Sequence, residues 1–270
     1  MRKYFIIFIL VIEIILVSLL IYVGVVYKNK KIISIAHRGE TSRIIENTLP
    51  ALEEAVKDSY NGIEIDVRRT SDGVIVLNHD KKISGTINGE VYTYNISKTP
   101  YEKLREIILM YDSEYGKIHI ATLAEALKYA HDNNIELAIH CKIQDDDFLL
   151  QVAQMVVDYG MSGKCMYNVV NDYENHIRVI TSIDKNAKFH ITYNYLLTED
   201  NNIFDLLKGN QIVITIKADL LTEQIFKKIR ETGGIFYAYS VDKYSFNKVS
   251  KYKPDYIEYS DGVRISEIKN

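Results

Sequence analysis

The sequence is poor in several residues that mark particular protein classes. Its 270 residues include no tryptophan, three prolines and two cysteines, Cys141 and Cys165, which do not form a CxxC motif. Both cysteines fall in predicted strands, where we expect buried free thiols. They therefore carry no information about the redox compartment. The chain also contains no internal repeat and no low-complexity segment.

An excess of positive charge is absent as well. Residues 1–31 hold five of the 33 basic residues and one of the 36 acidic ones, which leaves a net charge of −7 on the remainder. Proteins that bind nucleic acids usually present a basic face to the phosphate backbone. We therefore expect no nucleic-acid partner.

A single long apolar run lies at the N-terminus. Residues 4–27 are apolar except for Glu13, Ser18 and a few tyrosine hydroxyls, and no A-x-A cleavage pattern follows them. A helix of this length, at about 1.5 Å per residue, covers a hydrocarbon core of roughly 30 Å. We expect residues 1–31 to form an uncleaved membrane anchor with a short linker. Basic residues flank both ends of the run, and we expect a single-pass protein with the domain that follows the run outside the cytoplasm.

The remaining residues, 32–270, alternate short β-branched runs with helical patterns. Predicted strands cover 32–36, 62–67, 136–141, 164–168, 188–192, 211–216, 235–241 and 256–259. Predicted helices cover 48–59, 123–133, 148–159, 173–183, 203–208, 222–232 and 244–252. Eight strands interleaved with helices predict an α/β fold, a (β/α)8 TIM barrel.

A ninth apolar run, residues 74–78, follows the second strand too closely for a parallel crossover. The Asp72-Gly73 turn between them is typical of a hairpin, so we expect an antiparallel return strand that brings His79 back toward Asp66. Residues 81–120 then form an irregular stretch with a short helical piece at 100–107. A stretch of this length is more typical of a lid or specificity insertion than of a connector.

Two carboxylates alternate along the second strand. Glu64 and Asp66 are two residues apart and therefore face the same way. Such a pair suits a hard divalent cation, although a solvated polar strand face is the alternative. His37 and Arg38 follow the first strand, at the barrel end that carries active sites. Histidine suits proton transfer near neutral pH, and arginine can form paired hydrogen bonds with phosphate oxygens.

These residues belong to a pattern that resembles the glycerophosphodiester phosphodiesterase family, within the phosphodiesterase barrels that also include phosphatidylinositol-specific phospholipases C. The pattern consists of HRG, ENT, E-x-D, T-x-DG and HD. The matching residues are His37, Arg38, Gly39, Glu46, Asn47, Thr48, Glu64, Asp66, Asp72, Gly73, His79 and Asp80. The resemblance implies a divalent metal on Glu64 and Asp66, acid–base catalysis by His37 and His79, and release of sn-glycerol 3-phosphate and an alcohol.

The second half of the chain matches the family with substitutions. Lys142 stands where the family has a phosphate-binding lysine, but the family's third metal ligand, a glutamate, is replaced by His140. Tyr239 replaces a tryptophan and is expected to form a wall for the glycerol or the leaving alcohol, and Ser260-Asp261 replaces Thr-Asp. The family implies Mg²⁺ or Ca²⁺, whereas an imidazole ligand is better suited to Mn²⁺, Fe²⁺ or Zn²⁺.

Three interpretations of His140 follow. It ligates a transition metal, or it faces the phosphate while Glu64, Asp66 and water hold the cation, or the site is impaired and the chain binds a phosphate ligand without turnover. The first two predict a metal-dependent phosphoric diester hydrolase acting on glycerophosphodiesters. An alternative substrate is lysophospholipid or a glycerophosphate envelope polymer, which the predicted anchor would bring close to the site.

Overall fold

The computed structural model describes residues 32–268 except 171 and 194–210, and also Ile12, Ile15 and Ser18. Most of the predicted anchor and the predicted helix at 203–208 lie outside these residues. None of the helices in the described part is long and apolar enough to cross a membrane. Residues 33–270 form one compact unit, which is described by itself below.

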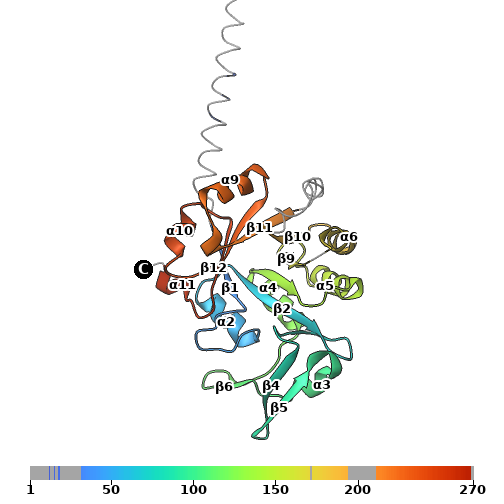
Figure 1. Ribbon diagram of the computed structural model, residues 1–270. Helices are drawn as coiled ribbons and strands as arrows, with labels where there is room; N and C mark the ends of the chain where they lie inside the picture. The colour runs from blue at the N-terminus through green and yellow to red at the C-terminus, as the bar shows by residue number, and fades with distance from the viewer. Residues whose placement is uncertain are drawn as a thin grey trace, which may run out of the picture. The chain divides into compact units, whose positions relative to one another are not determined.

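Eight parallel strands close into a barrel in the described part of the chain (Figure 1). They are β1 (Ile33–His37), β2 (Gly62–Arg69), β8 (Glu136–Cys141), β9 (Cys165–Asn168), β10 (Lys188–Thr192), β11 (Gln211–Lys217), β12 (Ile235–Val241) and β13 (Tyr256–Tyr259). Each strand pairs with the next one in this order, and pairing of β1 with both β2 and β13 closes the ring. The predicted barrel and its eight strands are confirmed.

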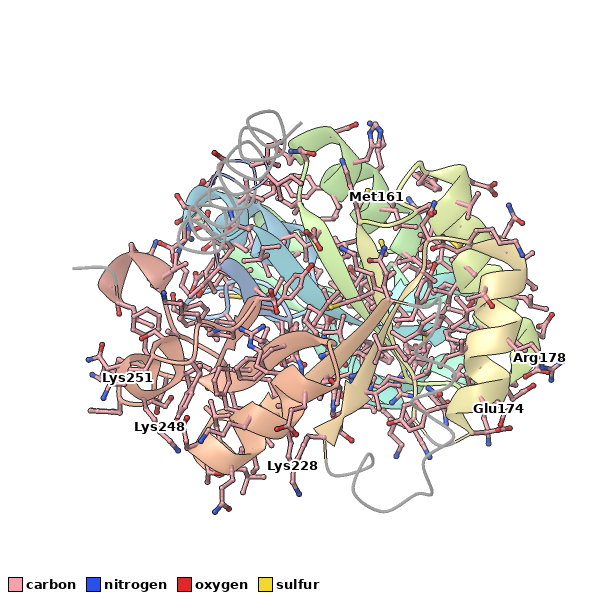
Figure 2. The ribbon with its side chains drawn as sticks, turned by 90° about the horizontal axis from the view of Figure 1, so that it is seen from above. Met161, Glu174, Arg178, Lys228, Lys248 and Lys251 are labelled. Carbon is pink, nitrogen blue, oxygen red and sulfur yellow. The ribbon has the colours of Figure 1, made fainter. Side chains whose placement is uncertain are left out.

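Helices surround the barrel on its outer side, as the view from above shows (Figure 2). They are α2 (Leu49–Lys57), α4 (Leu123–Asn133), α5 (Asp146–Asp158), α6 (Tyr173–Ile183), α9 (Glu223–Glu231), α10 (Phe246–Ser250) and α11 (Ile265–Ile268), with the short 3-10 turn η2 (Ala218–Leu220) after β11. In this view Glu174 and Arg178 of α6 and Lys228 of α9 point away from the strands. The helices therefore bury one face on the barrel and solvate the other.

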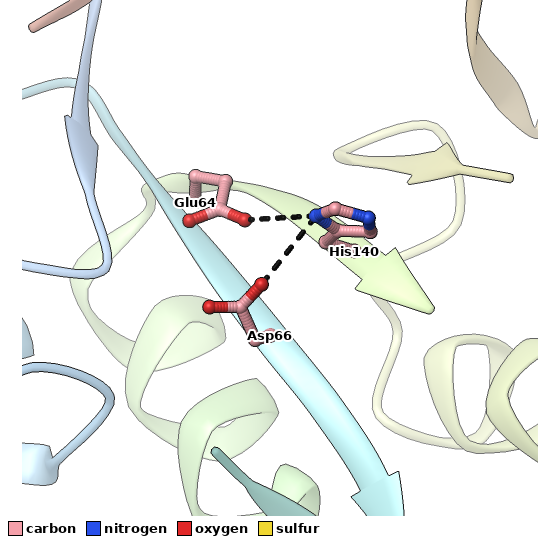
Figure 3. Close-up of side chains that lie close together, drawn as sticks. All are labelled: Glu64, Asp66 and His140. Atoms are coloured by element: carbon pink, nitrogen blue, oxygen red, sulfur yellow. Dashed lines mark ion pairs between the residues drawn. The ribbon is translucent and has the colours of Figure 1, made fainter. Parts of the chain in front are cut away.

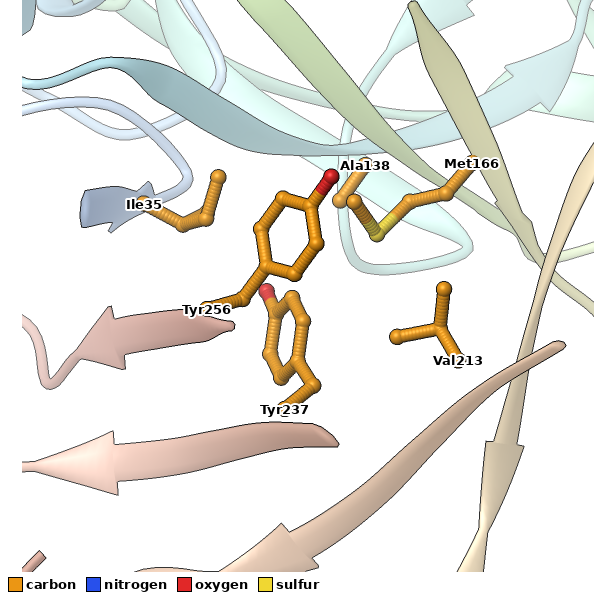
Figure 4. Packing of buried hydrophobic residues seen from close by; sticks show 6 residues of the cluster. All are labelled: Ile35, Ala138, Met166, Val213, Tyr237 and Tyr256. Carbon is orange, nitrogen blue, oxygen red and sulfur yellow. The ribbon is translucent and has the colours of Figure 1, made fainter. Parts of the chain in front are cut away.

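The inside of the barrel is a packed core. Six strands each contribute one inward side chain to a single cluster (Figure 4): Ile35, Ala138, Met166, Val213, Tyr237 and Tyr256. Every member is at most 4% exposed. This layer closes the barrel from within and leaves the C-terminal strand ends free to carry chemistry.

The ninth apolar run is the predicted antiparallel strand, β3 (Ile75–Leu77), which pairs with the end of β2. In the turn between them, the Thr70 hydroxyl donates to Asp72 at 2.5 Å, and Gly73 has a φ of 88°. Beyond β3, the Asn78 amide donates to the Asp66 carbonyl at 3.0 Å. The hairpin therefore returns the backbone beside His79 to Asp66, as the sequence predicts.

The prediction of an irregular stretch at 81–120 is wrong. The segment consists of β4 (Lys82–Ile87), β5 (Glu90–Asn95), the 3-10 turn η1 (Ile96–Lys98), α3 (Tyr101–Leu104), β6 (Met110–Asp112) and β7 (Gly116–Ile118). The strands form two antiparallel hairpins, β4–β5 and β6–β7. Asn88-Gly89, with φ values of 53° and 86°, makes the tight turn of the first. A small core of its own, including Ile83, Ile96 and Leu104, packs against β3.

The second hairpin is attached to α2 by ion pairs around the buried carboxylate of Glu54. Arg43 and Lys57 each place a nitrogen 2.9 Å from this carboxylate, and the Tyr115 hydroxyl donates to it at 2.7 Å. Lys57 also reaches Glu114, in the hairpin turn, at 2.7 Å. Burial opposes ionisation of Glu54, but these partners outweigh it and lower its pKa from 4.5 to about 2.

This lowered pKa predicts a pH-dependent contribution to stability. A carboxyl group with a depressed folded-state pKa stabilises the fold above its unfolded pKa, and the effect is lost as the pH falls toward the folded value. We expect Glu54→Gln to reduce the free energy of unfolding by about 1–3 kcal/mol at pH 7 and by progressively less between pH 5 and pH 3. Urea denaturation across this range measures the difference. Glu53→Gln, on the same helix, is the control, and a pH-independent loss in Glu54→Gln would contradict the prediction.

Candidate active site at the C-terminal strand ends

The chain turns sharply after β1, and this turn places the first two site residues. His37 ends the strand, and Arg38 and Gly39 follow with φ values of 58° and 94°. A Cβ at Gly39 would lie 2.7 Å from the Cβ of Ala51, so only glycine allows the loop to approach α2 this closely. The turn directs the Arg38 amide to the Glu64 carboxylate, at 3.2 Å.

The three residues of the ENT motif each make a defined contact. Glu46 accepts a hydrogen bond from the Arg38 guanidinium at 2.9 Å. The Asn47 side chain makes two hydrogen bonds with Asp66, both at 2.9 Å. Its Nδ2 donates to the Asp66 carboxylate, and its Oδ1 accepts from the Asp66 backbone amide. Thr48 caps the N-terminus of α2. The motif therefore holds both an arginine and a buried carboxylate in place.

Glu64, Asp66 and His140 converge above the barrel core (Figure 3). Asp66 and His140 are register partners on β2 and β8, and His140 Nδ1 lies 3.4 Å from Asp66 and 3.8 Å from Glu64. One ligand atom from each residue lies within 4.8 Å of the others. At metal–ligand distances of about 2.0–2.6 Å, a single divalent cation could contact all three.

The charges around this cluster also fit a cation. Asp66 is fully buried, and its pKa stays low because Lys142, Asn47 and Arg38 outweigh the effect of burial. Its Oδ1 lies 2.8 Å from the Lys142 ammonium but lacks a hydrogen bond of good geometry among the described residues. The pKa of Glu64 is raised by burial and by repulsion from Asp66 and Glu258. A bound cation would add a ligand to the Asp66 carboxylate and favour ionised Glu64.

The surroundings of His140 favour the uncharged form of its imidazole. Burial, reinforced by the neighbouring Lys142 ammonium, lowers its pKa to about 4. Lys142 Nζ lies 3.0 Å from His140 Nδ1. The imidazole is therefore uncharged at neutral pH, which is the state that can ligate a metal.

The two predicted catalytic histidines each have an aspartate partner. With its proton on Nδ1, His37 donates to Asp261 Oδ1 at 2.7 Å, and its Nε2 faces Glu64 at 3.9 Å. His79 Nδ1 lies 2.8 Å from Asp80 Oδ1 in the same way. An aspartate on Nδ1 fixes the orientation and tautomer of the ring, which leaves Nε2 for proton transfer. Asp80 and Asp261, known from the sequence only as motif residues, thereby acquire a physical role.

Sequence reasoning missed two residues at this end of the barrel. Glu258 on β13 is buried, accepts a hydrogen bond from the Tyr237 hydroxyl at 2.6 Å, and has a pKa raised by burial. His190 on β10 is buried at the level of His140, two strands away, and neither of its ring nitrogens has a partner in the described part. In both cases the available signal was one polar residue inside an apolar strand.

Tyr239 is half-buried near the end of β12 and packs against the inner cluster. Burial raises its pKa, and Glu258 acts in the same direction. Its role as a substrate wall stays a prediction.

Curated relatives resemble part of the chain. The chain is 29% identical over 154 residues to the glycerophosphodiester phosphodiesterase of Caldanaerobacter subterraneus. The aligned residues cover 56% of this chain and 58% of that protein. It is 31% identical over 116 residues to human glycerophosphodiester phosphodiesterase 1, covering 42% of this chain and 34% of that protein. The matches thus span less than two thirds of the length of both relatives.

Solved structures share the fold. The glycerophosphodiester phosphodiesterase of Agrobacterium tumefaciens superposes with a TM-score of 0.71 at 20% identity, covering 88% of this chain and 100% of that one. A phosphodiesterase of Oleispira antarctica, solved with the product sn-glycerol-3-phosphate, gives 0.70 at 20% identity, covering 90% and 97%. The glycerophosphoryl diester phosphodiesterase family pattern itself matches residues 37–258. The chain therefore belongs to the glycerophosphoryl diester phosphodiesterase family.

Proposed function

We propose that this protein is a phosphoric diester hydrolase that cleaves glycerophosphodiesters into sn-glycerol 3-phosphate and an alcohol. The observation that carries the proposal is the cluster of Glu64, Asp66 and His140, with the His37–Asp261 pair, Arg38 and Lys142 against its carboxylates. Family membership supports the reaction class. The product found in the Oleispira antarctica structure agrees with it.

In this proposal Glu64, Asp66 and His140 hold a divalent cation. When bound, the cation polarises the phosphate and neutralises charge that develops in the transition state. Arg38 and Lys142 bind the phosphate oxygens. Arg38 is already oriented for this by Glu46, at 2.9 Å, and by Asp66, at 3.1 Å.

His37 and His79 divide the proton transfers. One accepts the proton of the nucleophile at Nε2, and the other protonates the departing alkoxide. The nucleophile is either water or a glycerol hydroxyl of the substrate, which would give a cyclic intermediate. Their aspartate partners stabilise whichever ring is protonated at each stage.

Substitution of either histidine tests this assignment. We expect His37→Ala and His79→Ala each to reduce kcat for a glycerophosphodiester by about 10²–10⁴-fold, because a positioned proton-transfer group typically contributes that much. Thermal unfolding should change little, since both side chains are partly exposed. His131→Ala, on the exposed face of α4, is the matched control. Near-normal turnover in either catalytic variant would refute the acid–base pair.

The presence of His140, where the family has a glutamate, predicts an unusual metal preference. We expect the full-length protein to bind Mn²⁺ or Zn²⁺ more tightly than Mg²⁺ or Ca²⁺, and His140→Glu to reduce the ratio between these affinities, because carboxylate oxygen favours the harder ions. Calorimetric titration with each metal measures binding independently of activity. An unchanged ratio of affinities in the two proteins would show that His140 is not a ligand.

Two other proposals remain from the sequence. If the chain is attached to a membrane through residues 4–27, with the domain outside the cytoplasm, lysophospholipid or a glycerophosphate polymer becomes the substrate. Turnover of these in preference to glycerophosphocholine would favour that substrate class.

If Lys142 stands permanently against His140 and Asp66 instead of a metal, the protein binds a phosphate ligand only. Retained binding without turnover under any metal would favour this last proposal.

A further inference from the structure

A pocket opens beside the end of β2 and the residues after β8, two residues along the chain from Asp66 and His140. It has a volume of about 320 Å³, within the range of small-molecule sites. Its walls come from the ends of β2 and β8 and from the start of η1 in the insertion, which lies beyond the end of β2 in Figure 1. The polar side chains that line it are Arg68, Arg69, Lys81, Asn95, Ser97 and Lys142.

The lining of the pocket is basic and contains no carboxylate. Two of the cations are neutralised elsewhere, since Arg69 pairs with Asp145 and Asp147 and Lys142 pairs with Asp66. Arg68 and Lys81 have no carboxylate within 4.0 Å in the part of the chain that the structure describes. Burial lowers the pKa of Arg68, and the more distant charges of Asp66 and Asp80 only partly offset this. The pocket therefore has positive charge left for a ligand.

The pocket is connected to the proposed catalytic groups. Lys142, a phosphate ligand in the proposal above, also lines the pocket. The Arg68 guanidinium donates two hydrogen bonds to the carbonyl of His79, at 2.9 and 2.5 Å. A substrate whose phosphate lies on Lys142 would thus extend one of its arms into the pocket on the His79 side.

We propose that this basic pocket selects glycerophosphodiesters whose alcohol arm carries its own anionic group, a second phosphate or a carboxylate. This rests on the proposed hydrolase function and specifies its substrate class. Arg68 and Lys81 contact the distal anion, and Asn95 and Ser97 of the insertion add neutral polar contacts. Arginine and lysine together suit phosphate, the first by paired hydrogen bonds and the second as a point charge. A cationic arm, as in glycerophosphocholine, would be disfavoured.

The test compares four diesters that share the glycerol 3-phosphate half. Their alcohols are glycerol, glycerol carrying a terminal phosphate, glycerate and choline. We expect kcat/KM of the full-length protein to be about tenfold higher for the phosphate and carboxylate arms than for glycerol, and lowest for choline. Raising the ionic strength from about 0.05 to 0.5 M should reduce the ratio of kcat/KM between the anionic arms and the glycerol arm, because salt screens the attraction between the basic pocket and the anion. A poly(glycerophosphate) oligomer then distinguishes a polymer from a small bisphosphate as the source of the second anion.

Lys81→Gln is the decisive variant, because Lys81 is exposed and stands outside the proposed catalytic groups. We expect it to reduce kcat/KM about fivefold for the anionic arms, equivalent to about 1 kcal/mol, and to leave the glycerol arm unchanged. Lys82→Gln, its exposed neighbour that does not line the pocket, should change neither. Equal effects on all arms, or equal effects of the two variants, would overturn the proposal.

Binding of the diesters to the His37→Ala variant distinguishes a failure of the proposed hydrolase function from a failure of the pocket assignment. If wild-type protein hydrolyses none of the diesters but His37→Ala still binds the anionic arms more tightly than the glycerol arm, the hydrolase function fails and the pocket assignment stands. If all arms are hydrolysed at equal rates, the function stands and the pocket assignment fails.

Discussion

The charge of Asp66 is the constraint on which the site depends. A carboxylate with no exposure to solvent is costly unless hydrogen bonds and opposite charges replace its hydration. Asn47 supplies the hydrogen bonds, and Arg38 and Lys142 supply the charge. Removing any one of these partners would raise the cost of keeping this charge buried. The loop after β1, the ENT turn and the end of β8 supply one partner each.

Glu64 and Glu258 are two further carboxyl groups buried at the site. Both are buried carboxyl groups whose pKa values are raised, and each lies in the field of Asp66. The family's usual glutamate at the third metal position would place yet another negative charge beside them. With a neutral His140 there instead, β8 adds no negative charge to Glu64, Asp66 and Glu258. The exchange therefore limits the number of buried carboxyl groups that must be stabilised at this end of the barrel.

The barrel was predictable because its strands are buried on both faces and separated by amphipathic helices, so apolar runs and helical periodicity alternate clearly. The insertion was not, since β6 and β7 are only three residues each and carry little periodicity. The Asn88-Gly89 turn was nevertheless a readable hairpin signal. At the site, His37, Glu64 and His79 could be predicted because they stand in motifs whose spacings resemble those of the family. Glu258 and His190 were missed because a lone polar residue in an apolar strand looks like ordinary packing until its neighbours on other strands are known.

The His37–Asp261 pair joins residues 224 positions apart in the chain. It links the end of the first barrel strand to the turn after the last. During synthesis on the ribosome, the metal-site strands β2 and β8 emerge long before Asp261 does. The metal-site residues are thus all synthesised while His37 still lacks its aspartate. If His37 transfers protons as proposed, a correctly oriented ring has to await closure of the barrel, which would tie the onset of catalysis to completion of the fold.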